Sequence, residues 1–209
     1  MTAPRALRKT RDDWLETAIG LLKSGGIETV QITALSRMLG ITRGSFYWHF
    51  ENRDDLLGAM IAQWRARNTG VMLDALSGAR DLDDGLLALF SIWVDHTRFD
   101  PALDQAVRDW ARHAPHVARA VSAEDDARMA AISDFLIRHG FAQPEAYIRA
   151  RVIYLTQVSY YALGICDPGP ERLGYLDPYF RCFIGRPPDR DAAEAYVTDY
   201  LAMLERHAT

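Results

Sequence analysis

The sequence contains very little cysteine and no long hydrophobic run. Cys166 and Cys182 are the only two cysteines in 209 residues, which is too few for the disulfide framework of a secreted protein. The opening residues lack the apolar stretch of a signal peptide, and no segment approaches the roughly 20 apolar residues that span a bilayer. These absences favour a cytoplasmic protein without a membrane partner.

Sequence patterns of common catalytic and metal sites are also missing. We find no Gly-rich phosphate loop, serine elbow or helical Glu-x-x-His pair, so we expect neither an enzyme nor a cofactor. His113 and His116 lie close in the sequence, but Pro115 interrupts the helix that would align them, and no nearby carboxylate or thiol completes a ligand set. We therefore expect no metal. A helical-bundle enzyme would need a titratable cluster that we cannot assemble.

The charge of the chain is unevenly distributed. The formal net charge is -4, yet residues 1–50 hold seven Lys and Arg against four Asp and Glu, so this part is basic and the remainder is acidic. Lys and Arg that neutralise phosphates release counterions, which favours binding to nucleic acid. The basic N-terminal part indicates an anionic partner, although chance variation in surface charge is an alternative.

Apolar residues recur at spacings of three and four along almost the whole chain, which predicts an all-α fold without strands. Pro and Gly positions set most of the expected helix ends. The expected helices are Arg11 to Ser24, Ile32 to Leu39, Thr42 to Phe50, Asn52 to Leu76, Leu82 to Phe99, one from Pro101, Pro115 to Gly140, Pro144 to Ile165, a short one after Pro178, and Ala192 to Arg206.

The segment Gln31–Phe50, QITALSRMLGITRGSFYWHF, predicts a helix-turn-helix. Two helices that cross at a steep angle need a small residue where they touch and a glycine where the chain turns with positive φ. Ser36 and Gly40 supply these. The apolar positions then share one core, and the second helix keeps a free face for a major groove.

The free face of the second helix is the expected DNA contact. A helical wheel places Phe46, His49 and Phe50 inward, Gly44, Tyr47 and Trp48 outward, and Ser45 at the border. Tyr47 is expected to bind a phosphate, and Gly44 permits close approach. His49 is either a buried structural histidine or a phosphate contact.

The N-terminal end of that helix is expected to face DNA as well. Thr42 is placed to cap the helix, which would present backbone N–H groups and a positive dipole to phosphate. Arg43 adds a full charge there. Arg43, Ser45 and Trp48 are the expected readers of base edges or thymine methyl groups.

The stretch Phe46-Tyr47-Trp48-His49-Phe50, followed by ENRDDLL, resembles the N-terminal signature of the TetR-like transcriptional regulators. The resemblance covers about Arg11 to Leu57, with Ser36 in place of the usual Ala, Arg53 in place of Lys, and a very large Trp48 in a variable position. It implies that Tyr47 and Arg53 hold phosphates. The complete expected DNA-binding set is Gln31, Thr33, Thr42, Arg43, Gly44, Ser45, Tyr47, Trp48, His49 and Arg53.

The resemblance also implies that the chain has two domains with different functions. It predicts a three-helix DNA-binding domain at residues 1–52 and a larger helical domain at 53–209 that binds an effector and dimerises, and DPALDQAVRDWARHAPHVARAV is similar to such sensor domains. The expected protein is a ligand-responsive repressor that binds a palindromic DNA operator as a homodimer. Two-fold symmetry would let the DNA-binding domains of the two subunits bind successive major grooves roughly 34 Å apart. Whether it represses or activates stays open.

Polar groups beside apolar stripes suggest a pocket for a small apolar or aromatic effector. The candidate lining residues are Phe90, Trp93, His96, Val107, Arg108, Trp110, Tyr154 and Gln157. Core packing of the tryptophans, and an internal hydrogen bond or ion pair for His96 and Arg108, are the alternatives. A further alternative is a DNA-binding dimer whose C-terminal domain serves protein interaction or dimerisation without any effector.

The last two long helices are the expected dimer interface, because each is apolar on more than one side. The helix from Pro144 carries Arg151, Tyr154, Val158 and Tyr161 on one face and Ile148, Val152, Leu155 and Ala162 on another. We expect the interface to comprise Arg151, Tyr154, Val158, Tyr161, Tyr196, Tyr200 and Met203.

Overall fold

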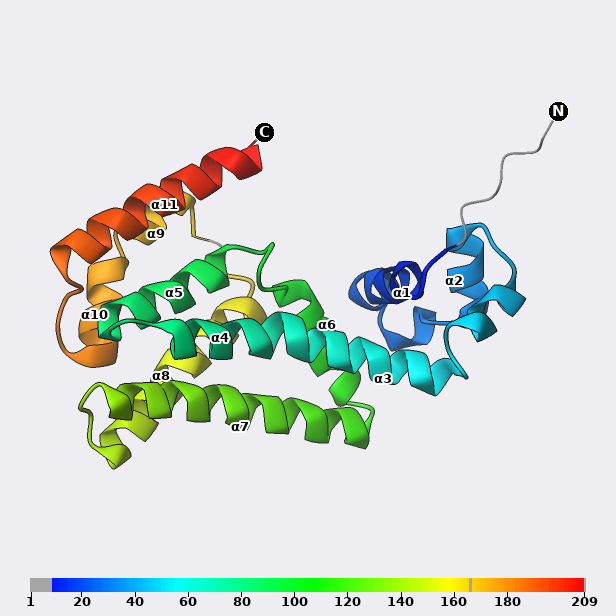
Figure 1. The fold of residues 1–209 in the computed structure, drawn as a ribbon, viewed down its shortest axis with the longest axis horizontal. Coiled ribbons are helices and arrows are strands. Elements are labelled where there is room, and N and C mark those ends of the chain that lie inside the picture. The colour runs from blue at the N-terminus through cyan, green and yellow to red at the C-terminus, as the bar shows by residue number, and fades with distance from the viewer. Residues whose placement is uncertain (1–8, 166, 209) are drawn as a thin grey trace. The chain divides into compact units, whose positions relative to one another are not determined.

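A computed structural model describes residues 9–165 and 167–208, and these residues contain helices and loops but no strand (Figure 1). The all-α prediction is thereby confirmed. The elements are α1 (Arg11–Gly25), η1 (Ile27–Thr29), α2 (Ile32–Leu39), η2 (Arg43–Trp48), α3 (Arg53–Trp64), η3 (Arg65–Gly70), α4 (Val71–Gly78), α5 (Leu82–Val94), α6 (Pro101–Ala111), α7 (Pro115–Arg138), α8 (Gln143–Ala162), α9 (Gly169–Leu173), α10 (Leu176–Ile184) and α11 (Arg190–Ala208).

Several expected helices differ from those observed. The segment expected as one helix from Asn52 to Leu76 consists of α3, a π-helical turn η3 and α4, and α5 ends at Val94 rather than Phe99. The segment from Thr42 to Phe50 contains the 3-10 helix η2 and no α-helix. No described helix combines the length and the apolar composition needed to cross a membrane.

The chain packs into two compact units. Unit 1 comprises the described residues up to Ala66 together with Ala102–Val121, and unit 2 comprises Arg67–Pro101 and the described residues from Ser122 onward. This grouping differs from a division at residue 52, because Trp64 of α3 and Val107 of α6 are buried in the same core as α1. The division at residue 52 remains a prediction about function.

Unit 1 is built around the aromatic residues of α1 and of the segment after α2. The Trp14 and Phe46 ring centroids lie 5.3 Å apart in an edge-on arrangement, and Phe50 stacks on Phe46 at 5.4 Å. All three rings are buried. A capping box begins α1: the Thr10 hydroxyl accepts from the Asp13 backbone N–H, and Asp13 accepts from the Thr10 backbone N–H.

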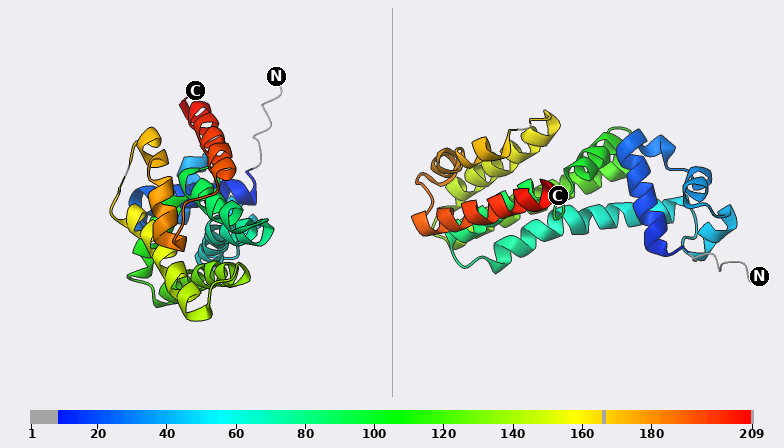
Figure 2. Two further views of the ribbon diagram at one scale, coloured as in Figure 1. Left: turned by 90° about the vertical axis from the view of Figure 1, so that its left-hand side faces the viewer. Right: turned by 90° about the horizontal axis from the view of Figure 1, so that it is seen from above.

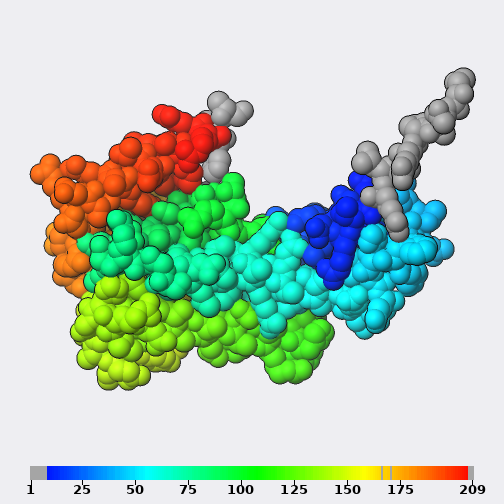
Figure 3. Space-filling model, in the orientation of Figure 1, coloured from blue at the N-terminus to red at the C-terminus, as the bar shows by residue number. Residues whose placement is uncertain are grey.

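Unit 2 is a helical bundle in which α4 packs on α5, and α11 lies along α5 (Figures 1 and 2). Its core includes Leu89 and Ile92 of α5, Phe135 of α7 and Phe180 of α10, all fully buried. The orange-to-red segment containing α10 and α11 forms part of the surface of this unit (Figure 3). The short helices α9 and α10 occupy the Pro- and Gly-rich stretch before α11.

Candidate DNA-binding surface and effector pocket

The turn between α2 and η2 has the predicted chemistry. Gly40 has φ +68°, in the left-handed region that favours glycine, and the Ile41 N–H donates to the Ser36 carbonyl at 3.0 Å. Ser36 is buried, and its hydroxyl donates to the Ile32 carbonyl at 2.7 Å. The predictions for Ser36 and Gly40 are confirmed, and together they fix the point from which η2 departs.

The predicted cap at Thr42 is wrong. Thr42 is the residue before η2, but its hydroxyl lies 3.3 Å from the Ser45 hydroxyl and makes no cap to a backbone N–H. The 3-10 helix that follows is only six residues long, so few peptide dipoles align at its start. A positive charge at this end comes from the Arg43 side chain rather than from a helix dipole.

The exposure of the residues in η2 follows the predicted inward and outward sets. Phe46 is buried, whereas the Tyr47 and Trp48 side chains are 62% and 76% exposed. Arg43 and Gly44 are exposed, and Ser45 is half-buried. We call the exposed residues Gln31, Thr33, Arg37, Met38, Thr42, Arg43, Gly44, Tyr47 and Trp48 the α2–η2 surface. It belongs to unit 1, whose light-blue segment lies at the molecular surface (Figure 3).

Two members of the α2–η2 surface were not predicted from the sequence. Arg37 is exposed on α2, and Met38 beside it is 61% exposed despite its apolar side chain. Thr33 and Arg37 are four residues apart on α2 and therefore share a face. That spacing was a usable signal, because Thr33 was already expected to contact DNA.

Arg53, expected at a phosphate, is half-buried, and so is His49, for which a buried structural role and a phosphate contact were both open. Arg53 lies at the start of α3 and is engaged inside unit 1: its Nε donates to the Val30 carbonyl at 2.8 Å and its Nη2 to the Ile27 carbonyl at 3.2 Å. These bonds tie α3 to the segment before α2. The observed role of Arg53 is therefore to brace the helix-turn-helix, and its phosphate contact stays a prediction.

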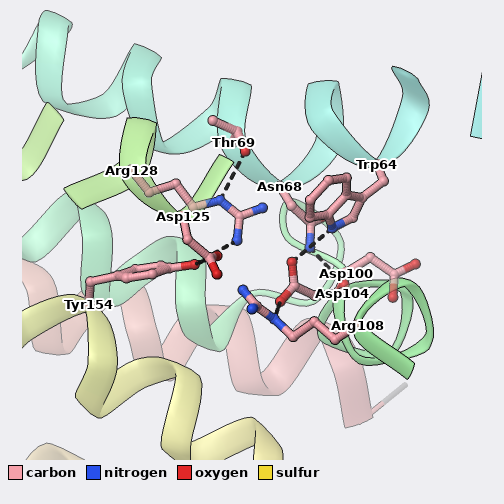
Figure 4. A network of polar contacts seen from close by, with 9 residues as sticks. All are labelled: Trp64, Asn68, Thr69, Asp100, Asp104, Arg108, Asp125, Arg128 and Tyr154. Carbon is pink, nitrogen blue, oxygen red and sulfur yellow. Dashed lines mark hydrogen bonds and ion pairs between the residues drawn. The ribbon is translucent and has the colours of Figure 1, made fainter. Parts of the chain in front are cut away.

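The expected pocket residues do not come together. Val107, Arg108 and Trp110 belong to α6 in unit 1, where Val107 and Trp110 are core residues. Arg108 donates through Nε to the buried Asp104 carboxylate at 2.8 Å, and Asp104 also accepts from the Trp64 indole N–H at 2.8 Å (Figure 4). His96 is exposed in the loop after α5. These four residues and Tyr154 of α8 do not line the unit 2 cavity described next, and the internal ion pair expected as the alternative for Arg108 is observed.

Unit 2 contains a cavity of about 40 Å³ between α5, α8, α9, α10 and α11. Phe90, Trp93 and Gln157 line it, as predicted. Most of the remaining lining comes from segments that the sequence did not mark, including Tyr160, Arg172, Tyr179, Phe183, Tyr196 and Tyr200. The cavity is small compared with the roughly 300–1,000 Å³ of pockets that hold drug-sized ligands.

The polar groups of this cavity include an amide, a guanidinium and several phenol hydroxyls. Gln157 is only 8% exposed, and its Nε2 has no hydrogen-bond partner among the described residues. The Tyr160 and Tyr179 hydroxyls lie 2.6 Å apart. Burial raises the pKa of the Tyr196 and Tyr200 phenols, and the positive charge of Arg172 opposes part of that rise. Both phenols therefore stay protonated at neutral pH and can donate hydrogen bonds.

Three of the seven expected dimer-interface residues are buried in unit 2, and the other four are half-buried. Tyr154 is buried, donates to the Asp125 carboxylate at 2.5 Å, and accepts from the buried Arg128 at 3.1 Å (Figure 4). The Tyr161 hydroxyl donates to the Trp93 carbonyl at 2.9 Å.

The remaining expected interface residues also contribute little to the surface. Tyr200 and Met203 are buried, and Arg151, Val158 and Tyr196 are half-buried. The exposed apolar side of α8 is the face opposite Tyr154, which carries Ile148, Val152 and Leu155. The α8 residues assigned to the partner are thus buried or half-buried within unit 2, and the dimer interface stays a prediction.

The comparisons with known proteins concern mainly the N-terminal segment. Residues 15–60 match the family model of the bacterial regulatory proteins, tetR family. The "Probable acrEF/envCD operon repressor" of Escherichia coli K12 is 36% identical over 55 residues, which is 26% of this chain and 25% of that protein. The HTH-type transcriptional regulator AcrR of Shigella flexneri is 33% identical over 49 residues, covering 23% of each chain. The match thus spans about a quarter of these relatives.

Solved structures extend the likeness to the whole fold. A TetR-family transcriptional regulator from Marinobacter aquaeolei VT8 has a TM-score of 0.63 at 14% identity, over 93% of this chain and 98% of that one. The TetR-family regulator CifR, solved as a cysteine mutant with a 26 bp operator DNA, has a TM-score of 0.62 at 19% identity, over 87% and 100%. Residues 15–60 of this chain are therefore similar to the tetR family, and the chain as a whole has the fold seen in TetR-family regulators.

Proposed function

We propose that the chain is a transcriptional repressor that binds a palindromic DNA operator as a homodimer and is released by a small apolar or aromatic effector. The observation that carries the proposal is the α2–η2 surface, where Arg43, Tyr47 and Trp48 are exposed within the six residues of η2, a segment anchored by buried Phe46. The relatives named as an operon repressor and as an operator complex support it. An operator-binding protein shares the compartment of the chromosome, so we propose a cytoplasmic location.

The proposed roles follow from side-chain chemistry. Arg43 can donate two parallel hydrogen bonds to a guanine edge, and the Tyr47 hydroxyl can donate to a phosphate oxygen. Trp48 offers a flat apolar face to thymine methyl groups or to the sugar-phosphate backbone. Gln31, Thr33 and Arg37 approach the backbone from α2, with Thr42, Ser45, His49 and Arg53 completing the proposed contact set.

Selection of binding sites from a random DNA pool, followed by gel mobility shift at rising salt, tests this proposal. Arg43→Ala should weaken binding of the selected site by about 5- to 150-fold and relax its sequence preference, because a base contact is lost. Tyr47→Phe should weaken all sequences alike, by about 2- to 12-fold, because one phosphate hydrogen bond is lost. Arg112→Ala removes an exposed arginine of unit 1 outside this surface and should change nothing. Failure of the wild-type chain to select any site contradicts the proposal.

A second candidate is a DNA-binding dimer whose C-terminal part has no effector. The small free volume of the unit 2 cavity favours it, because a drug-sized molecule enters only if lining side chains move. The Gln157 Nε2, which has no partner among the described residues, favours an effector instead. Buried polar groups are normally hydrogen-bonded, and a bound ligand could supply the acceptor. A thermal-shift screen of small aromatic metabolites separates the two: a compound that both raises the Tm and releases the operator supports an effector.

A further inference from the structure

We infer that the unit 2 cavity takes a single-ring aromatic carboxylate, an inference that rests on the proposed function in which this cavity holds the effector. Three properties of the cavity lead to this ligand class: its aromatic walls, the sign of the charge in its lining, and an amide that lacks a partner.

Aromatic rings form much of the cavity wall. Phe90 lies nearly parallel to Phe183, with ring centroids 6.2 Å apart, and edge-on to Trp93 at 6.1 Å. Tyr196 and Tyr200 of α11 stack at 6.0 Å. Rings pack favourably on the faces and edges of other rings, so such walls favour a flat aromatic group over an aliphatic chain.

Among the described residues that line the cavity, one side chain is charged, and that charge is positive. Arg172 of α9 forms no ion pair with a carboxylate among the described residues, and its Cζ lies 5.5 Å from the centre of the Tyr160 ring. Burial and the Tyr179 hydroxyl raise the pKa of the Tyr160 hydroxyl, and Asp167 raises it further, but Asp167 does not line the cavity. A carboxylate is the ligand group that a guanidinium binds most strongly, through charge-assisted hydrogen bonds.

The charge of Arg172 also decides against the other ligand that aromatic walls attract. A quaternary ammonium group binds over the faces of Trp and Tyr rings, and a cavity with several tyrosines would suit it. Arg172 would repel such a cation, and none of the described residues that line the cavity is an Asp or Glu that could offset the repulsion. An anion is therefore the better match.

The Gln157 amide supplies the second polar contact. It comes from α8, is more than nine-tenths buried, and has an Nε2 without a partner among the described residues. A ligand oxygen, from the carboxylate or from a ring hydroxyl, would accept from Nε2 and satisfy it. The free volume of about 40 Å³ favours the smallest aromatic ligands, and even a single ring is admitted only as the lining side chains move.

Titration calorimetry of the full-length chain with benzoate, salicylate and 4-hydroxybenzoate tests the inference. Benzyl alcohol and phenyltrimethylammonium serve as the neutral and cationic probes. At least one carboxylate should bind more tightly than either probe. Arg172→Met should weaken it by about 10- to 150-fold, as expected for loss of a charged hydrogen bond, and Arg172→Lys should weaken it less. Gln157→Leu should weaken it several-fold, and Arg181→Met, on neighbouring α10 outside the cavity, should not change it.

Two results would overturn the inference: preference for the neutral or cationic probe, or unchanged carboxylate affinity in a folded Arg172→Met protein. Operator binding, measured in parallel by mobility shift, separates this from the proposed function. A carboxylate that binds through Arg172 without releasing the operator supports the ligand class and contradicts the effector part of the proposed function. Operator binding without any carboxylate binding overturns the ligand class alone.

Discussion

Asp104 is a buried carboxylate that joins α3 and α6 inside unit 1. It accepts from the Trp64 indole N–H and from Arg108, each at 2.8 Å. Because it is almost fully buried, its charge depends on these donors for solvation. The pair therefore contributes to the rigidity of the unit that carries the α2–η2 surface, although it has no contact with DNA in the proposed function.

Removing this carboxylate should destabilise the protein strongly. In Asp104→Ala, Arg108 and the Trp64 indole lose an acceptor, and the expected loss is about 3–5 kcal/mol in the free energy of unfolding. Asp109→Ala on the same helix is the control: it breaks an exposed ion pair with Arg112, which is worth at most about 1 kcal/mol. Urea unfolding measures both. Similar losses for the two variants would contradict the role given to Asp104.

Gly85 of α5 is required by close packing in unit 2 rather than by its backbone angles. A Cβ placed on Gly85 would lie 2.2 Å from Cζ of Phe135, a ring that is itself fully buried. Gly85→Ala should cost about 1–3 kcal/mol of stability through overpacking. Gly58→Ala in α3, where nothing lies within 4 Å, should instead stabilise by about 0.5–1 kcal/mol.

The double variant Gly85→Ala, Phe135→Leu checks the cause of that loss. If the ring is the obstacle, trimming it should recover part of the stability lost in Gly85→Ala, measured against Phe135→Leu alone. Strictly additive losses in thermal unfolding would rule out a clash between these two positions.

At the scale of elements, the helix-turn-helix depends on the left-handed residue between α2 and η2. Gly40→Ala places a Cβ at φ +68°, which should cost about 1–2 kcal/mol. Gly40→Asn should cost less, because Asn tolerates this conformation. Gly44→Ala is the informative comparison: its Cβ meets only the Thr42 hydroxyl at 3.8 Å, so stability should hold while affinity for a selected operator falls. Equal loss of stability in the Gly40 and Gly44 variants would count against this account.

The helix-turn-helix could be predicted from the sequence because its constraints are local. Ser36, Gly40 and Phe46 lie within eleven residues, and each follows from the steric needs of one turn and one small core. The faces of α8 could not be predicted in the same way. Tyr154 and Val152 lie on opposite apolar sides, and only the distant partner Arg128, with Asp125, shows that Tyr154 belongs inside.

The lining of the unit 2 cavity was even harder to predict from the sequence than the faces of α8. Phe90, Trp93 and Gln157 were recognised as polar or bulky residues on apolar faces, whereas Arg172 and Tyr179 lie in a Pro- and Gly-rich stretch without helical periodicity. Such a stretch predicts turns, and its position against α5 and α8 depends on long-range packing. Arg108 does not reach the cavity because it pairs with the buried Asp104, four residues earlier on the same helix.

At the scale of the whole molecule, the proposed homodimer requires an apolar surface that the single chain leaves exposed. On α8, Ile148 is 57% exposed, and Val152 and Leu155 are each 45% exposed, along one side of the helix. Apolar residues at this spacing form a stripe that a second copy of the helix can cover. The stripe lies opposite the side that holds Tyr154 in the interior.

Val152→Glu should convert the proposed dimer into a monomer, because pairing would bury two carboxylates against apolar surface without partners. Sedimentation velocity over a range of protein concentrations measures the change, and affinity for a two-half-site operator should fall with it, because a monomer engages one half-site at a time. Tyr154→Phe removes only the buried hydroxyl contacts with Asp125 and Arg128, so it should lower the Tm while the dimer persists. If the Val152→Glu protein remains a dimer and the Tyr154→Phe protein dissociates, the interface is formed by the face of α8 that carries Tyr154. That result would contradict the interface proposed here.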